Sequence, residues 1–252
     1  MSIKTAVVDG VATIEIARPE KKNAITGAMY HAMAAALDAA KADTAVRAVL
    51  ITGQPGIFTS GNDIEDFVQR PSDEDPPSIT FMKALIGCDK PVIAAVTGAA
   101  IGIGTTMLLH CDFVYVSDEA RLAMPFVSLG LVPEFASSLI VPQLMGNARA
   151  AEKLLLGDPF TGADAVECGI ANAVLPASEV VKHARRVAER FNALPPGAVR
   201  ETKRLMRRGR SAAILETIGV ERDLFGARLQ SPEAKEAFSA FFEKRKPDFS
   251  RF

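Results

Sequence analysis

Short apolar runs alternate with amphipathic stretches along most of this chain of 252 residues. Residues 6–8 and 11–17 are rich in β-forming side chains, and Asp9 and Gly10 separate them. An Asp-Gly pair tolerates the positive φ angles of a two-residue turn. The chain is therefore predicted to open with an antiparallel β-hairpin.

After the hairpin, the pattern changes to apolar strands that alternate with helical segments. Thr26 is a good N-cap for the alanine-rich segment that follows it. Strands that alternate with helices in this way indicate an α/β layer structure. The expected elements are a helix over 27–43, strands over 47–53 and 90–98, a short helix over 102–111 and a strand over 112–118.

The chain from residue 179 to residue 252 is predicted to be helical, because no further strand pattern appears there. We divide the chain into a core over 1–195 and a C-terminal helical region over 196–252. The acidic, proline-rich segment 71–77 is expected to be an exposed loop. The basic segment 200–210 lacks the interleaved aromatic residues of an RNA-binding surface, so the solvated face of an amphipathic helix is favoured.

Composition narrows the possible partners and compartments. The formal net charge is −1, so no global field favours nucleic acid or an anionic membrane. Cys88, Cys111 and Cys168 are widely spaced, which disfavours a disulfide framework or a zinc site, and no metal is expected. No secretory leader, membrane span or peroxisomal terminus is recognised. These features predict a soluble, cytoplasmic protein.

Glu134 is the one ionisable residue between Leu122 and Met145. An acidic residue after proline can stabilise the start of a helix and face water. A carboxylate buried among apolar residues would instead have a raised pKa and could act as a base. The sequence alone leaves both interpretations open.

Two glycine-containing turns could supply free backbone N–H groups. The segment "GAAIGIGTTM" is not a dinucleotide-binding fingerprint, because Met107 stands where the third glycine is needed. The segment "SGND" at 60–63 also ends a buried run and opens a helix, for which a plain N-cap is the simpler interpretation. If both turns converged on one point, they would form an oxyanion hole.

Four segments carry a family resemblance: "RPEKKNAIT", "FTSGNDIEDF", the stretch from Lys90 to Glu134, and "AFFEKRKPDF". Together they resemble the enoyl-CoA hydratase/isomerase (crotonase) superfamily. The resemblance implies a spiral of ββα units, a C-terminal helical trimerisation region, and an acyl-CoA substrate. CoA is part of that substrate, and no separate cofactor is implied.

The resemblance also implies roles for individual residues. The N–H groups of Asn62 and Ile103 would hold the thioester oxygen, and Glu134 would be the catalytic base. The implied substrate-binding residues are Lys22, Ala24, Ser60, Gly61, Asp63, Ile64, Gly102, Thr106, Phe126 and Gly130. His110 is expected to be a packed histidine, and Asp112 to be structural.

Two departures from the family pattern shape the functional prediction. Hydratases of the superfamily carry glutamates at the places of Thr106 and Phe126, and neither side chain can act as acid or base near neutral pH. Glu134 matches the glutamate of the peroxisomal-type Δ3,Δ2-enoyl-CoA isomerases. The prediction is a homotrimeric or hexameric isomerase that moves a double bond from position 3 to position 2. Thioester hydrolysis, another crotonase reaction or a non-catalytic acyl-CoA-binding role stay open as alternatives.

Overall fold

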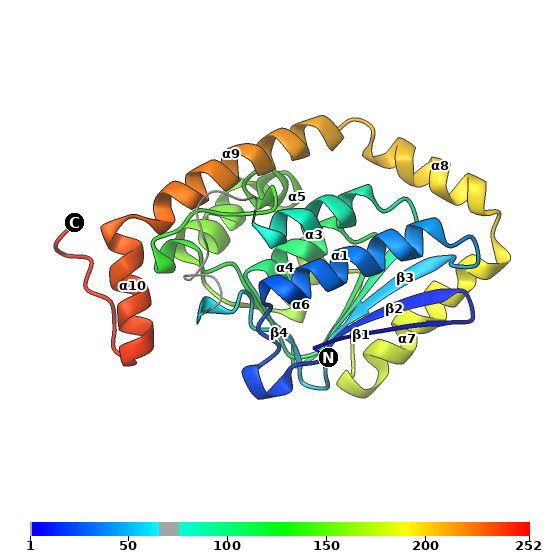
Figure 1. Ribbon diagram of the computed structural model, residues 1–252, viewed down its shortest axis with the longest axis horizontal. Helices are drawn as coiled ribbons and strands as arrows, with labels where there is room; N and C mark the ends of the chain where they lie inside the picture. The colour runs from blue at the N-terminus through cyan, green and yellow to red at the C-terminus, as the bar shows by residue number, and fades with distance from the viewer. Residues whose placement is uncertain (1, 66–75) are drawn as a thin grey trace.

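The computed structural model describes residues 2–65 and 76–252 and has an α/β architecture (Figure 1). The predicted hairpin is confirmed: β1 (Ile3–Val8) and β2 (Val11–Ile16) pair antiparallel, and both Asp9 and Gly10 have positive φ. The part of the acidic segment 71–77 that precedes residue 76 lies outside the described residues.

The hairpin forms one end of a six-stranded sheet with the order β1-β2-β3-β5-β7-β10. From β2 to β10, each pair of neighbouring strands in this order is parallel. The predicted strands over 47–53, 90–98 and 112–118 are all present in this sheet. Its remaining members are β3 (Ala48–Thr52), β5 (Val92–Val96), β7 (Phe113–Ser117) and β10 (Ala173–Leu175).

A second, smaller sheet has the order β4-β6-β8-β9. Each of its first three strands follows a strand of the large sheet along the chain and precedes a helical segment, so the chain winds as repeated strand–strand–helix units. This is the ββα spiral that the resemblance implied. The members are β4 (Ile57–Thr59), β6 (Ala99–Ile101), β8 (Arg121–Ala123) and β9 (Phe160–Thr161).

Both faces of the large sheet are covered, and β3 and β5 are accordingly buried at every position. Val49 and Ile51 of β3 join the larger core with α1 (Gly27–Ala42) and α3 (Pro77–Gly87). Ala48 and Leu50 face the opposite side and pack in a smaller core with α7 (Ala177–Glu189). The alternation follows from the period of two in a strand.

Further helical segments connect these layers. The predicted helix over 102–111 is present as α4 followed directly by η2, and Thr26 caps α1 by accepting a hydrogen bond from the N–H of Met29. The segments are η1 (Pro19–Lys21), α4 (Ile103–Thr106), η2 (Met107–His110), η3 (Val127–Leu129), α5 (Ser137–Ala151), η4 (Glu152–Leu156), α6 (Gly162–Glu167) and η5 (Arg190–Ala193).

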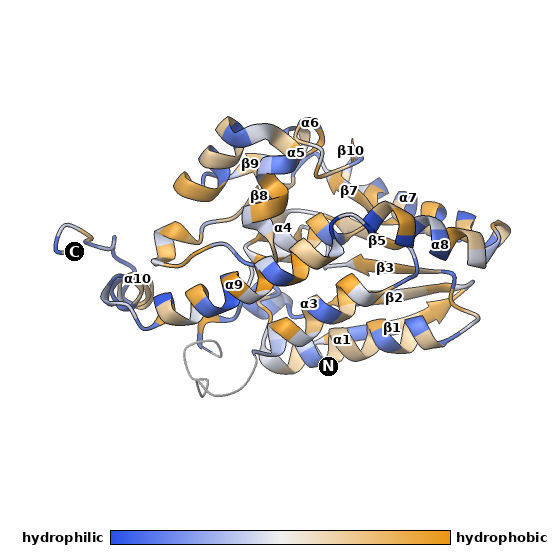
Figure 2. Ribbon diagram, turned by 90° about the horizontal axis from the view of Figure 1, so that it is seen from above, coloured by the Kyte–Doolittle hydropathy of each residue, from blue (hydrophilic) through white to orange (hydrophobic). Residues whose placement is uncertain are grey.

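Three C-terminal helices form an arc along the outside of the core, as Figure 1 shows. They are α8 (Pro196–Arg207), α9 (Ser211–Leu229) and α10 (Pro232–Glu243), and the chain ends in a non-helical stretch. The ribbon of α9 carries both hydrophobic and hydrophilic colours along its length in Figure 2, and Leu215, Val220 and Leu224 are about half exposed. The division at residue 195 stays a prediction.

The expectation of a solvated basic face over 200–210 is wrong for two of its residues. Lys203 is buried and donates to Oδ2 of Asp112 at 2.6 Å, and Arg207 donates to Oδ1 of Asp112 at 3.0 Å. Both cations therefore anchor α8 to the start of β7. The structural role expected of Asp112 is confirmed.

Candidate active site

The two glycine-containing turns lie side by side at one edge of the small sheet. β4 and β6 are parallel neighbours, so the turns that follow their carboxyl ends meet there. A Cβ on Gly61 would lie 2.9 Å from the carbonyl oxygen of Ile101, and Gly61 has φ of 95°. Both the backbone angle and this close approach require glycine at position 61.

Within the described part of the chain, each turn presents one backbone donor without a partner. The N–H groups of Gly61, Asp63 and Gly102 are all hydrogen-bonded within the protein. Those of Asn62 and Ile103 have no acceptor among the residues that the structure describes. Ile103 is the first residue of α4, where a helix leaves its N–H groups unpaired. The structure thus brings together two turns that each offer a free N–H, as an oxyanion hole requires.

Residues 22–25 lie directly against the 60–63 turn. The N–H of Ser60 donates to the carbonyl of Lys22, and the N–H of Ile25 donates to the carbonyl of Gly61. Arg18, which the sequence analysis did not single out, holds both segments: it donates to the carbonyl of Ala24 at 3.0 Å and to Asp63 at 2.5 Å. Hydrogen bonds therefore hold the Lys22–Ala24 segment against the predicted donor turn.

Glu134 is buried, with 8% of its surface exposed, so the interpretation as a water-facing helix cap is wrong. α5 begins only at Ser137, and Phe135 and Ala136 between them have left-handed φ angles of 58° and 55°. Such a conformation costs a residue with a Cβ about 1–2 kcal/mol. One restraint on this turn is His110, whose Nε2 lies 2.8 Å from the carbonyl oxygen of Phe135 while its ring stacks on the Phe135 ring. His110 is buried, as expected.

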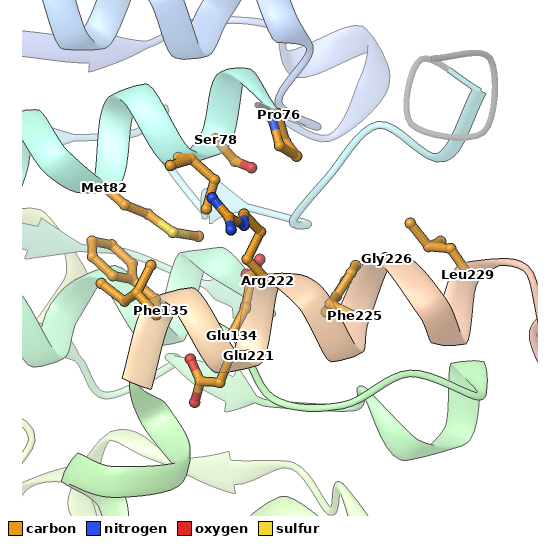
Figure 3. A pocket seen from close by; sticks show the side chains of 12 residues that line it. Pro76, Ser78, Met82, Glu134, Phe135, Glu221, Arg222, Phe225, Gly226 and Leu229 are labelled. Carbon is orange, nitrogen blue, oxygen red and sulfur yellow. The ribbon is translucent and has the colours of Figure 1, made fainter. Parts of the chain in front are cut away.

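The carboxylate of Glu134 lines a cavity of about 70 Å³ between α3 and α9, shown in Figure 3. Most of the lining is apolar and includes Ile79, Met82, Ile218 and Phe225. Burial among these side chains, and secondarily the charge of Glu221, raises the pKa of Glu134 to about 8. Its Oε1 has no hydrogen-bond partner within the described residues. A carboxylate in this state can take up and hold a proton near neutral pH.

Packed side chains connect the donor turns to Glu134. Tyr30 of α1 donates a hydrogen bond to Oδ1 of Asn62, and its ring lies 5.8 Å from the ring of Phe81. Phe81 in turn packs edge-on against Phe135, at 6.3 Å between ring centroids. From the other side, the helical segment that begins at Ile103 ends at His110, which contacts Phe135. The same core therefore positions the donors and the carboxylate.

The remaining predicted residues occupy different surroundings. Thr106 is fully buried on α4, and its hydroxyl has no partner among the described residues. Phe126 is buried and packs edge-on against Phe225. A Cβ on Gly130 would lie 2.6 Å from the N–H nitrogen of Ala234, so the structure places Gly130 against α10 and not among the residues lining the cavity.

Glu221 of α9 is a site residue that the sequence analysis missed. It is buried, lines the same cavity as Glu134, and accepts hydrogen bonds from the segment that follows Glu134. The sequence did contain a signal for this residue. Glu221 lies at helical spacing on the apolar stripe of α9 that Ile214, Ile218 and Phe225 form. A charged residue on the stripe that faces the core needs a partner there.

Comparisons with known proteins identify the family. Residues 7–251 match enoyl-CoA hydratase/isomerase, and the chain belongs to the enoyl-CoA hydratase/isomerase family. It is therefore an enzyme of that family, with the crotonase fold.

Relatives with both kinds of name are similar to this chain. A probable enoyl-CoA hydratase of Bacillus subtilis is 30% identical over 98% of each chain. The human enoyl-CoA delta isomerase 2 is 34% identical over 94% of this chain, which covers 62% of that longer protein.

Solved structures agree with this assignment. Pseudomonas aeruginosa OdaA is 54% identical, with a TM-score of 0.93 over 95% of this chain and 98% of its own. An enoyl-CoA hydratase/isomerase from Pseudoalteromonas atlantica is 39% identical, with a TM-score of 0.95 over 99% and 100% of the two chains.

Across residues 2–65 and 76–252, no helix combines the length and the apolar character needed to cross a bilayer. In the same ranges, no three His, Cys, Asp or Glu side chains are grouped as a metal site.

Proposed function

We propose that this enzyme moves the double bond of a 3-enoyl-CoA to position 2, with Glu134 as its single acid–base residue. The observation that carries this proposal is the state of Glu134: it is buried, its pKa is raised to about 8, and Oε1 is unpartnered among the described residues. A general base with a pKa near the working pH is the most effective kind.

The reaction needs one proton acceptor and a site for a developing oxyanion. Glu134 takes the proton from C2, and the electrons move onto the thioester oxygen as a dienolate. The N–H groups of Asn62 and Ile103 donate to that oxygen, where each such donor is worth about 3 kcal/mol in comparable sites. Glu134 then returns the same proton at C4, so that no water is added and no other cofactor is consumed.

The residues at the two hydratase positions support isomerisation over hydration. Thr106 and Phe126 stand where the hydratases of the family resemblance carry glutamates, and both are buried without any ionisable group of their own. Activation of water and protonation of the α-carbon would each need such a group. Glu134 alone is enough for a proton transfer between two carbons.

The acyl-CoA substrate and the assembly belong to the same proposal. Lys22 is exposed beside the donor turn, where its ammonium group can meet the anionic nucleotide portion of CoA. The assembly is a trimer or a dimer of trimers, as the family resemblance implies, and half-exposed apolar residues on α9 and α10, including Leu224, Phe241 and Phe242, are available for contacts between subunits. A cytoplasmic location is part of the proposal.

The test is the variant Glu134→Gln, assayed with 3-enoyl-CoA thioesters of several chain lengths. Gln keeps nearly the same volume but cannot accept the C2 proton, so we expect kcat to fall by about 10⁴-fold or more. Affinity for an unreactive acyl-CoA, measured by calorimetry, should persist because the backbone donors are unchanged. The matched control is Glu119→Gln on the exposed surface, which should retain full activity.

Other outcomes decide between the remaining functions. Release of free CoA by the wild type without isomerisation would assign thioester hydrolysis instead. Binding of acyl-CoA without any turnover would assign a binding role. Wild-type isomerase rates in Glu134→Gln would refute the single-glutamate mechanism.

A further inference from the structure

Glu221 holds the chain segment that carries Glu134. Its carboxylate accepts hydrogen bonds from the N–H of Ala136 at 2.5 Å, from the N–H of Ser138 at 3.0 Å and from Oγ of Ser138 at 2.5 Å. Glu221 lies on α9, 83 to 85 positions further along the chain, and only 5% of its surface is exposed. One buried carboxylate thus accepts three hydrogen bonds immediately after the proposed base.

These contacts replace the local cap that α5 lacks. Ala136 is the N-cap residue of α5, and alanine has no side-chain oxygen to accept the first N–H groups of the helix. A carboxylate is well placed at this end because the helix dipole is positive there. Phe135 and Ala136 both hold left-handed conformations, which persist only where surrounding contacts restrain them, and the bonds to Glu221 are among those contacts.

The ionised carboxylate of Glu221 also places a negative charge in the cavity of Glu134. Glu134 and Glu221 both line this cavity, and their sticks lie close together beside α9 in Figure 3. A side-chain cap supplied by a serine at position 136 would satisfy α5 without that charge. The position of Glu221 therefore affects both the geometry and the electrostatics of the base.

We propose, on the basis of the isomerase function above, that Glu221 is a positioning residue for Glu134. It fixes the turn over 135–138 so that the Glu134 carboxylate points into the cavity, and its negative charge favours the protonated form of Glu134. Glu221 itself does not contact the reacting atoms in this scheme. It makes Glu134 a stronger base and holds it at the site of proton transfer.

The charges around the pair support this role. The charge of Glu221 contributes to the raised pKa of Glu134, after burial itself. The other ionisable side chains that face the pair, among the described residues, are Arg222, which lines the cavity from α9, and His110, which contacts Phe135 from η2. Burial lowers the pKa of His110 to about 4, so it stays neutral above pH 5, and arginine keeps its charge. Burial raises the pKa of the Glu221 carboxyl as well, and once ionised it is the carboxylate of the described cavity lining whose charge acts on Glu134.

The experiment compares kcat and KM from pH 5 to 9.5 in the wild type, Glu221→Gln and Glu221→Asp. Gln removes the charge and can no longer accept all three hydrogen bonds. We expect the acid limb of kcat/KM to move from near 8 to lower pH by about one unit, because the like charge is lost. The plateau of kcat should fall by about tenfold through misplacement of the base, with KM changed less than about twofold.

The aspartate variant separates charge from reach. Asp keeps the negative charge but is shorter by one methylene, so it cannot contact Ala136 and Ser138 together. It should keep the acid limb of the wild type while kcat falls. Glu216→Gln, on the exposed side of α9, is the matched control and should leave both parameters unchanged.

The outcomes distinguish this proposal from the one on which it rests. If Glu134→Gln is inactive but Glu221→Gln keeps the wild-type acid limb and kcat, the role of Glu221 is refuted and the isomerase function stands. If the acid limb of kcat/KM lies at the same pH in Glu221→Gln and Glu221→Asp, the electrostatic role of Glu221 is refuted. If Glu134→Gln stays active, the isomerase mechanism itself fails, independently of either Glu221 variant.

Discussion

Glu134→Gln should make the folded protein more stable at alkaline pH while it abolishes turnover. The reason is the cost of ionising a buried carboxyl group. In the fold, burial and the charge of Glu221 hold the pKa of Glu134 at about 8, against an ordinary value of 4.5. Between these two values the folded protein keeps the proton and the unfolded chain loses it. The contribution of Glu134 to stability is therefore complete below pH 4.5 and is lost as the pH rises through 8.

The size of the effect follows from linkage. Each pH unit within the window lowers the free energy of unfolding by up to 1.4 kcal/mol, so the loss between pH 5 and 8 amounts to about 3.5 kcal/mol. Gln has nearly the same shape as protonated Glu and does not titrate. The variant and the wild type should thus be of similar stability at pH 5, and the variant should be more stable by about 3.5 kcal/mol at pH 8.

The assay is urea unfolding of both proteins at one protein concentration, at pH 5, 6, 7 and 8. Glu119→Gln serves as the control for loss of an exposed carboxylate, and its difference from the wild type should not change with pH. A difference between Glu134→Gln and the wild type that is independent of pH would refute the raised pKa. That result would also refute the explanation of how Glu134 acts as a base.

Three further predictions concern the reaction, the assembly and the helical region. Hydration of 2-enoyl-CoA should be negligible, because Thr106 and Phe126 supply neither acid nor base; rapid loss of the conjugated absorbance with formation of 3-hydroxyacyl-CoA would contradict this. Sedimentation should give a trimer or a hexamer at micromolar concentration, and a monomer would disprove it. Asp112→Ala should lower the free energy of unfolding by about 3 kcal/mol, because Lys203 and Arg207 lose their shared partner. The exposed Asp118→Ala should cost less than about 0.5 kcal/mol in the same denaturation series.

The sequence by itself determined the elements whose signals are local. Asp9 and Gly10 specify the hairpin through their backbone angles, and Thr26 specifies the start of α1 through one hydrogen bond. The continuous apolar runs predict strands that are buried on both faces. The isolation of Glu134 between Leu122 and Met145 also indicated a special environment, since nearby charges that could stabilise it are absent from that stretch.

Only the tertiary structure decided which surroundings Glu134 and the basic segment have. Whether Glu134 faces water or a cavity depends on α9, which begins 77 residues further on, and the contacts of Glu221 with Ala136 and Ser138 likewise join distant parts of the chain. Lys203 is buried for the same reason, because its ammonium group donates a hydrogen bond to Asp112, 91 positions earlier in the chain. Periodicity and turn chemistry report only on neighbours along the chain, whereas burial and the pKa of a carboxyl group are set by whatever packs against it.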